Sequence, residues 1–520
     1  MAVSPLLTLA LALSLGPPLA AAAPFGAGDA LFMGPASQQH YRDYHASWVL
    51  WGDQHGAAQL QEAHAAGVKL APSFWCLTAG PERLHDDPAL AEAVCRDIEG
   101  QPIEVPWQAD HSYQGTPTWF GCTNAPAFQA LLEQRADEVA ALGPDGVQVD
   151  DPLGTLNPVE AGTGCYCRHC AIAFRAWLQA HDSPQLRSEA GVGDWTGFDY
   201  PALVRRVATT RAQTQAHAPR IPLHRAYVRF QVEARVAGLK ALRDRVRART
   251  RPDLPFSLNA YFDHPGGPFV ALLPLTTHQV AEVVHYANFG TQRLWEAAQA
   301  YRQADALGCP LAATASGEDY AWVKAHDAVD LVKVWIGLGF AMGQRLMVPH
   351  PERQWCHTGL LGTHWYAAPV APFAPLYRFA QAHDALLEGF QAVGPAAVGS
   401  AAGLDLLDAD ARQALAQRLQ AVDGPWMAGD HVWVLPRRHP DGRLVVHLLN
   451  TQYSVALNLL APVVDQPVSL AADLWPPHSR HALLHRPDGP DLRLPVQRAG
   501  GSVRFTVTGF DAWAIAEAAD

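Results

Sequence analysis

Residues 143–178 read GPDGVQVDDPLGTLNPVEAGTGCYCRHCAIAFRAWL. A short apolar run ends in Asp150 and Asp151, and a group of cysteines then precedes a helical pattern. A β-type run followed by a helical pattern is the unit of a parallel α/β fold, and the acidic pair lies where the strand ends. The fold therefore depends on how many such units the chain contains.

Similar units recur along the chain, with β-rich runs separated by segments whose apolar residues repeat at helical spacing. We expect helices at 126–142, 225–250 and 291–307, and strands at 47–52, 68–75, 116–122, 145–151, 254–262, 282–289, 310–319 and 345–350. Eight alternating units predict an α/β fold of the (β/α)8 TIM-barrel type. An open doubly wound sheet is the alternative, although no glycine-rich nucleotide-binding motif follows any strand.

The pattern changes after about residue 385. Short alternating runs are separated there by turns such as HPDG and RPDG, which is typical of an antiparallel β-sandwich. We expect four parts: a signal peptide at 1–23, the barrel at 24–390, a helical linker at 391–425 and the C-terminal β-sandwich at 426–520.

Composition narrows the choice of partner and compartment. The 520 residues carry a net charge of −12, from 38 Lys+Arg and 50 Asp+Glu, with no basic block, so we expect no nucleic-acid partner. After the apolar leader, no segment is long and apolar enough to predict a membrane span. The leader predicts a secreted or periplasmic protein. Whether the chain forms a homo-oligomer stays open.

Polar and aromatic residues gather where the predicted strands end, which is where barrels carry their active sites. Carboxylates and amides bind hydroxyl groups and aromatic rings cover the apolar face of a sugar, so we expect a carbohydrate substrate. The candidate catalytic residues are Asp150, Asp151 and Glu318. The candidate substrate-binding residues are Trp51, Trp75, Asn124, Asn259, Tyr261, Asp263, Tyr286 and His350.

Glycosidic cleavage uses two carboxyl groups on either side of the bond, and the strand-four aspartates and Glu318 could supply them. Each has a structural alternative. An aspartate at a strand end often caps the next helix, and Glu318 could belong to a salt bridge.

Cys165, Cys167 and Cys170 form a C-x-C-x-x-C pattern, with spacing that suits a metal better than a disulfide. Tetrahedral zinc needs a fourth ligand. Cys122 is the first candidate, because neighbouring parallel strands bring their loops together, and His169 is the substitute. Disulfides among these cysteines are the alternative. We expect a structural zinc ion and no organic cofactor.

Three stretches resemble the glycoside hydrolase family 42 β-galactosidases: FGCTNAPAFQALL (120–132), GVQVDD (146–151) and CYCRHCAIAFRAWL (165–178). The resemblance implies a structural zinc held by Cys122, Cys165, Cys167 and Cys170, and by position alone it matches Glu318 to that family's nucleophile. The family's acid/base pair, Asn-Glu, falls here on Asp151 and Pro152, which implies a divergent barrel glycosidase.

We therefore predict an exported glycoside hydrolase that uses carboxylates at the ends of strands four and seven. A non-catalytic carbohydrate-binding protein on a decayed barrel is the alternative, because the Asn-Glu pair is lost. A metal-dependent hydrolase is disfavoured, since the histidines form no H-x-H or H-x-x-E-H pattern.

Overall fold

The computed structural model describes residues 24–260, 266–394, 404–420 and 424–519. The expected leader at 1–23 lies outside this part of the chain, as do the candidate residues Tyr261 and Asp263. Within the described ranges, no helix combines the length and hydropathy needed to cross a bilayer.

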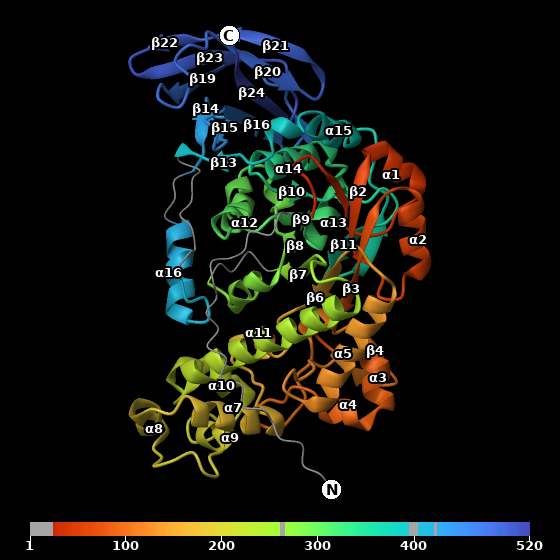
Figure 1. Cartoon of the computed structure of the whole chain (residues 1–520), viewed down its shortest axis with the longest axis vertical. Helices are drawn as coiled ribbons and strands as arrows, with labels where there is room; N and C mark the ends of the chain where they lie inside the picture. The colour runs from red at the N-terminus through yellow and green to blue at the C-terminus, as the bar shows by residue number, and fades with distance from the viewer. Residues whose placement is uncertain (1–23, 261–265, 395–403, 421–423, 520) are drawn as a thin grey trace.

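The centre of the molecule is a barrel of parallel strands (Figure 1). A bridge between Phe32 and Val348 brings the first strand beside the segment that follows the last. This confirms the predicted α/β barrel. In spatial order the strands are β1 (Ala30–Phe32), β2 (Ala46–Gly52), β3 (Lys69–Trp75), β6 (Val147–Asp150), β7 (Phe256–Ala260), β8 (Gln279–Val283), β9 (Leu311–Ala315) and β10 (Arg345–Leu346).

One predicted barrel strand is wrong. In the segment 116–122, Thr116–Pro117 (β5) pairs antiparallel with Ser112–Tyr113 (β4), and the rest makes isolated antiparallel bridges to Val94 and Glu104. The segment therefore belongs to the long connection between β3 and β6. The missing strand is β1, which is too short to show a sequence pattern.

Helices surround the barrel, and the three helices predicted from periodicity are present as α5, α11 and α12. The helices outside the β6–β7 connection are α1 (Gln38–Tyr44), α2 (Ala57–Ala65), α3 (Pro81–Asp86), α4 (Pro88–Glu92), α5 (Pro126–Ala141), α12 (Leu294–Ala306), α13 (Gly317–His326), α14 (Val329–Ala341), α15 (Ala374–Ala382) and α16 (Ala409–Gln420).

The connection between β6 and β7 is the longest in the barrel and projects at the foot of Figure 1 together with α3 and α4. It contains α6 (Leu156–Glu160), α7 (Arg168–Ala180), α8 (Pro184–Ala190), α9 (Tyr200–Val204), α10 (Arg211–His217) and α11 (His224–Arg249). After β10, the chain forms a hairpin of β11 (Gln354–Thr358) and β12 (Gly362–Tyr366). Short 3-10 turns are η1 (Pro106–Gln108), η2 (Ala218–Arg220), η3 (Pro268–Leu275), η4 (Ala287–Phe289) and η5 (Asp384–Leu386).

The C-terminal region consists of antiparallel sheets that enclose a core of their own, including Val434, Val446, Val468 and Phe505. The larger sheet contains β13 (Gln391–Ala392), β14 (Trp426–Ala428), β15 (Val432–Arg438), β16 (Leu444–Asn450), β20 (His481–Arg486), β21 (Gly489–Pro495) and β24 (Trp513–Ala519). The smaller contains β19 (Gln466–Ala471), β22 (Gln497–Ala499) and β23 (Ser502–Val507), and β17 (Tyr453–Ser454) pairs with β18 (Leu459–Leu460). β13, in the segment expected as a linker, pairs with β15.

The C-terminal region packs directly on the barrel helices α14 and α15. The Trp513 ring stacks on Phe340 at 5.3 Å between centroids and meets Phe379 edge-on at 5.2 Å. Gly337 on α14 permits this approach, because a Cβ there would lie 2.7 Å from the Trp513 Cβ. The barrel and the C-terminal sheets thus share one continuous core.

Candidate active site

Asp150 is the last residue of β6, and its carboxylate is the centre of a hydrogen-bond network. It accepts a hydrogen bond from Trp75 Nε1 at 2.8 Å, from Asn259 Nδ2 at 3.0 Å and from the Asp151 backbone N–H at 2.9 Å. The Trp51 side chain also lies close enough to lower the pKa of this carboxyl group. Burial raises the pKa of Asp150, while these donors act in the opposite direction because they stabilise the anion.

A second carboxyl group, that of Glu282 on β8, lies beside the first. The Asn259 amide, which donates to Asp150, also lies close enough to Glu282 to lower its pKa. Burial, reinforced by the negative charges of Asp150, Asp151 and Glu318, raises the pKa of Glu282 to about 8. At neutral pH, Glu282 is therefore mainly a protonated acid.

Strand geometry explains why these groups meet. Side chains two residues apart on a strand share a face, and Val280 of β8 packs in a core cluster contributed by several strands of the barrel. Glu282 follows on the same face, one layer nearer the carboxyl end. Trp75 is paired in register with Asp150 on the neighbouring strand, and an irregularity in β2 between Val49 and Gly52 accompanies the approach of Trp51.

Asp151 and Glu318, the other candidate catalytic residues, have different positions. Asp151 is buried and has a left-handed backbone with φ of 46°. Glu318 lies exposed in the first turn of α13 and is close enough to raise the pKa of Glu282. Its neighbour Asp319 is structural, because it accepts hydrogen bonds from the backbone N–H groups of His285 and Ala287.

Three candidate substrate-binding residues have structural roles in the protein. His350 is buried, with Nε2 3.0 Å from the Pro35 carbonyl and Nδ1 accepting backbone N–H groups, so both ring nitrogens are occupied. Asn124 contacts Cys170 Sγ at 3.3 Å, which places it at the cysteine group. The Tyr286 ring lies under the Arg293 guanidinium, 3.8 Å away. Trp51, Trp75 and Asn259 do surround Asp150.

Glu282 was not among the candidates from sequence. The predicted strand at 282–289 placed this residue at the amino end, whereas β8 spans Gln279–Val283 and places it at the carboxyl end. The signal was present as a single acidic residue inside the apolar run QVAEVV (279–284). An acidic side chain facing a barrel interior is unusual enough to have indicated a site.

Cys122, Cys165, Cys167 and Cys170 form one buried group, and all four sulfur atoms lie within 4.8 Å of one another. Cys122 Sγ is 3.5 Å from both Cys167 Sγ and Cys170 Sγ. No disulfide joins them in the structure. A tetrahedral zinc with Zn–S bonds of about 2.3 Å separates its sulfurs by about 3.8 Å, so the spacing fits this ion.

Hydrogen-bond donors point at these sulfurs, as thiolate ligands require. The Arg96 backbone N–H donates to Cys165 Sγ at 3.4 Å, and the side-chain amides of Asn124 and Gln231 donate to Cys170 Sγ at 3.3 and 3.4 Å. Cys122 lies in the β3–β6 connection just before α5, and the other three cysteines lie at the start of α7 in the β6–β7 connection, so the group joins the two long connections that flank β6.

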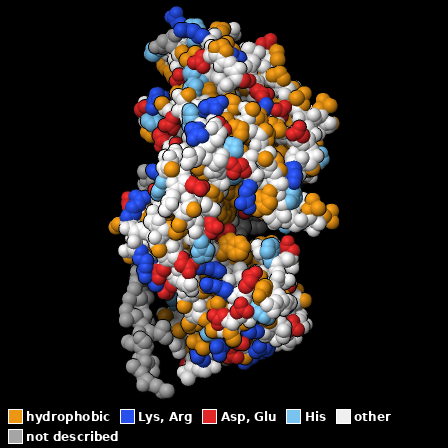
Figure 2. All heavy atoms as spheres, turned by 90° about the vertical axis from the view of Figure 1, so that its right-hand side faces the viewer, with side chains coloured by type: hydrophobic (Ala, Val, Ile, Leu, Met, Phe, Trp, Pro, Cys, Tyr) orange, Lys and Arg blue, Asp and Glu red, His pale blue; other side chains and the backbone are white. Residues whose placement is uncertain are grey.

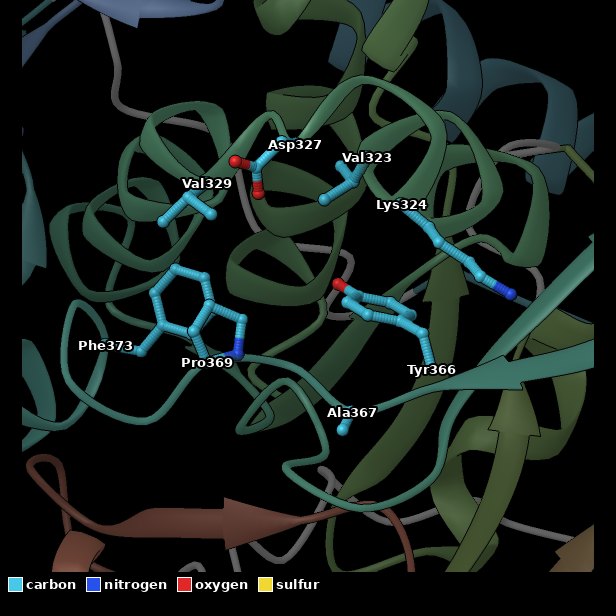
Figure 3. A pocket seen from close by; sticks show the side chains of 8 residues that line it. All are labelled: Val323, Lys324, Asp327, Val329, Tyr366, Ala367, Pro369 and Phe373. Atoms are coloured by element: carbon cyan, nitrogen blue, oxygen red, sulfur yellow. The ribbon is translucent and has the colours of Figure 1, made fainter.

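Two cavities lie elsewhere in the described part of the molecule. One of about 550 Å³ lies between η4–α12 and the C-terminal sheets, against Trp433 and Tyr453. A smaller one of about 110 Å³ has one lysine and one aspartate but no carboxyl pair (Figure 3). It is lined by Val323, Lys324, Asp327, Val329, Tyr366, Ala367, Pro369 and Phe373.

The surface is also hollowed on the side that lies to the right in Figure 1. Figure 2 shows this hollow in the middle of the face, with hydrophobic side chains in it. Asp150 and Glu282 line neither of these two cavities. The candidate active site is therefore identified from the chemistry of its side chains and not from a cavity.

No family model matches the chain, and no curated protein matches it. Solved structures do share its fold. The β-galactosidase from Bacillus circulans sp. alkalophilus has a TM-score of 0.55 at 11% identity, covering 93% of this chain and 96% of that one. A cycloisomaltooligosaccharide glucanotransferase from Paenibacillus sp. has a TM-score of 0.53 at 11% identity, covering 93% and 82%. These likenesses establish the fold.

Proposed function

We propose that the protein is a glycoside hydrolase in which Glu282 is the general acid and Asp150 is the carboxylate that acts at the anomeric carbon. The observation that carries this proposal is the pair itself. Two carboxyl groups lie near each other at the carboxyl ends of barrel strands. Burial raises the pKa of both, that of Glu282 to about 8, while hydrogen bonds from Trp75 and Asn259 stabilise the anion of Asp150. The similar fold of a β-galactosidase and a glucanotransferase supports a carbohydrate substrate.

The reaction would proceed as follows. The Glu282 carboxyl donates its proton to the glycosidic oxygen while the bond from this oxygen to the anomeric carbon breaks. Asp150 attacks that carbon and forms a glycosyl ester. A water molecule then gives a proton back to Glu282 and displaces Asp150 from the sugar. A covalent glycosyl ester at Asp150 implies that the anomeric configuration is retained.

Trp75 and Trp51 serve this chemistry in two ways. The Trp75 indole N–H and the nearby Trp51 side chain stabilise the anionic form of Asp150, and the Trp75 ring, 41% exposed, presents a flat surface to a sugar. The resemblance to family 42 is part of this proposal at the level of a divergent relative. Glu318 stays a second candidate partner for Asp150.

The test is hydrolysis of a panel of aryl glycosides and oligosaccharides by the parent and by matched variants. Asp150→Asn loses about 10³-fold or more in kcat/KM on every substrate, and Glu282→Gln loses about 10²- to 10⁴-fold on the oligosaccharides, whose leaving groups need an acid. Glu318→Gln and Asp151→Asn keep rates within about tenfold of the parent if they only shape the electrostatics. A loss at Glu318 equal to that at Asp150 would overturn the assignment of Glu282. A parent that binds sugars without turnover would favour the non-catalytic binding protein.

We also propose that the four-cysteine group holds a structural zinc ion and that the protein is exported. Zinc bound by four thiolates supplies no open position for substrate, so its contribution is to fix the two connections beside β6. The donors directed at Cys165 and Cys170 support this proposal. Metal analysis before and after a chelator tests the zinc site, and N-terminal sequencing of the secreted protein tests export.

A further inference from the structure

A second group of side chains of the types that bind metals, two histidines and an aspartate, lies between the barrel and the C-terminal sheets. His383 caps the C-terminus of α15, His485 is on β20 and Asp491 is on β21. One donor atom from each of the three lies within 4.8 Å of the others. Figure 1 shows α15 beneath the sheets that carry β20 and β24, so the group spans two parts of the molecule.

Hydrogen bonds orient both imidazole rings. His383 Nδ1 lies 3.0 Å from the Phe379 carbonyl oxygen, so it donates its proton there and leaves the Nε2 lone pair for another partner. His485 Nε2 is 3.1 Å from Glu517 Oε1. When that nitrogen donates to Glu517, Nδ1 carries the lone pair. An imidazole held by a carboxylate or a carbonyl on its far side is the usual arrangement of a metal-binding histidine.

The Nδ1 atom of His485 is buried and is positioned to bind a ligand. The ring is only 6% exposed, and among the described residues this nitrogen has no hydrogen bond of good geometry. It lies 3.0 Å from Asp491 Oδ2, and the His383 ring is 4.7 Å away between centroids. Two imidazole nitrogens and one carboxylate therefore converge on one point.

We propose that His383, His485 and Asp491 bind a divalent transition-metal ion of the zinc type, with Glu517 as the positioning residue for His485. Nitrogen and carboxylate donors suit Zn²⁺, which takes them at about 2.0–2.2 Å, and a water molecule can fill the fourth position on the side where Asp491 is exposed. The ion clamps α15 of the barrel to β20 and β21. It is independent of the four-cysteine group and of the hydrolytic site.

The rival account of the same contacts needs no metal. A doubly protonated His485 could bridge Asp491 and Glu517 as an ion pair. The two accounts make different predictions. Only the metal site requires His383, and only the metal site makes the thermal midpoint depend on Zn²⁺.

The experiment compares the zinc content and the thermal midpoint of the full-length parent with those of His383→Gln and Asp491→Asn, after incubation with Zn²⁺ and removal of excess ion. Each variant holds one zinc fewer per chain than the parent, whatever the four-cysteine group contains. Zn²⁺ raises the midpoint of the parent more than that of either variant. Glu517→Gln weakens Zn²⁺ binding about 10- to 100-fold without abolishing it.

The matched control is His478→Gln, which removes an exposed histidine from the turn between β19 and β20 and leaves zinc content unchanged. Asp491 is nearly half exposed, so Asp491→Asn folds even where His485 variants fail. Equal zinc content in the parent, His383→Gln and Asp491→Asn would overturn the proposal and favour the ion pair.

Discussion

Asp150 and Glu282 differ in their hydrogen-bond donors, and this difference sets their roles. Asp150 receives indole, amide and backbone N–H groups, whereas Glu282 lies near the Asn259 amide and faces the negative charges of three other carboxylates. In a confined site, two nearby carboxyl groups ionise one after the other, and the group with more donors ionises first. Glu282 therefore keeps its proton at neutral pH.

This order of ionisation predicts an alkaline limit to activity. The acid form of Glu282 is lost as pH rises through its pKa of about 8, so kcat/KM of the parent falls above that pH. In Glu282→Gln the residual activity lacks this limb, because the amide does not titrate. The pH profile of kcat/KM from pH 5 to 10 checks the prediction. An unchanged alkaline limb in the variant would assign it to another group.

The hydrogen bond from the Trp75 indole to Asp150 leads to a second prediction, which concerns the acidic limb of the pH profile of kcat/KM. The Trp75 N–H stabilises the Asp150 anion, so Trp75→Phe raises the pKa of Asp150 and moves the acidic limb of kcat/KM to higher pH, by about one pH unit. Trp107→Phe is the matched control, since Trp107 is similarly exposed and packs on Phe120. Equal profiles for the two variants would show that the indole N–H does not hold Asp150.

At the scale of elements, periodicity predicted the barrel but misplaced some of its edges. The strand at 145–151 and its acidic end were predicted, because a short apolar run stops there in two aspartates. β8 was placed a few residues late, since VVHYANF (283–289) continues the apolar character after the hydrogen-bonded strand has ended. A shift of this size moves Glu282 from the mouth to the base of the barrel.

Contacts between distant segments were harder to predict. Cys122 was placed beside Cys165, Cys167 and Cys170 by a loop argument, and they do lie together, although the segment before Cys122 is not a barrel strand. Asn124 was placed in the pocket by its nearness in sequence to a predicted strand end. It lies at the cysteines because the long β3–β6 connection turns its amide toward Cys170. No local pattern encodes that turn.

The two connections joined by the cysteines make an element-scale prediction. If zinc holds them, chelation or Cys122→Ser lowers the thermal midpoint and increases proteolysis within residues 76–167, because the connections lose their shared anchor. Cys309→Ser is the control, since this thiol lies outside the group beside Thr276 and Gln279. If a reducing agent lowers the thermal midpoint as Cys122→Ser does, while a chelator leaves it unchanged, the cysteines form disulfides and do not bind zinc.

At the scale of the whole molecule, the C-terminal sheets complete the core of the barrel. Trp513 is fully buried between Phe340 and Phe379, so Trp513→Ala lowers the free energy of unfolding by about 3–5 kcal/mol. Trp365→Ala, at a ring that is 47% exposed, lowers it by less than about 1 kcal/mol. Denaturant titration of both variants checks this. If Trp513→Ala lowers the free energy of unfolding as little as Trp365→Ala does, the contact of Trp513 with Phe340 and Phe379 contributes little, and the sheets fold separately from the barrel.

The catalytic pair is tested most directly by the effect of the leaving group on Glu282→Gln. A dinitrophenyl glycoside departs without protonation, whereas an alkyl glycoside needs an acid. We predict that Glu282→Gln loses about 10²- to 10⁴-fold in kcat/KM on the alkyl substrate and less than about tenfold on the dinitrophenyl substrate. Equal losses on both substrates, or no loss on either, would contradict the assignment of Glu282 as the acid that works with Asp150.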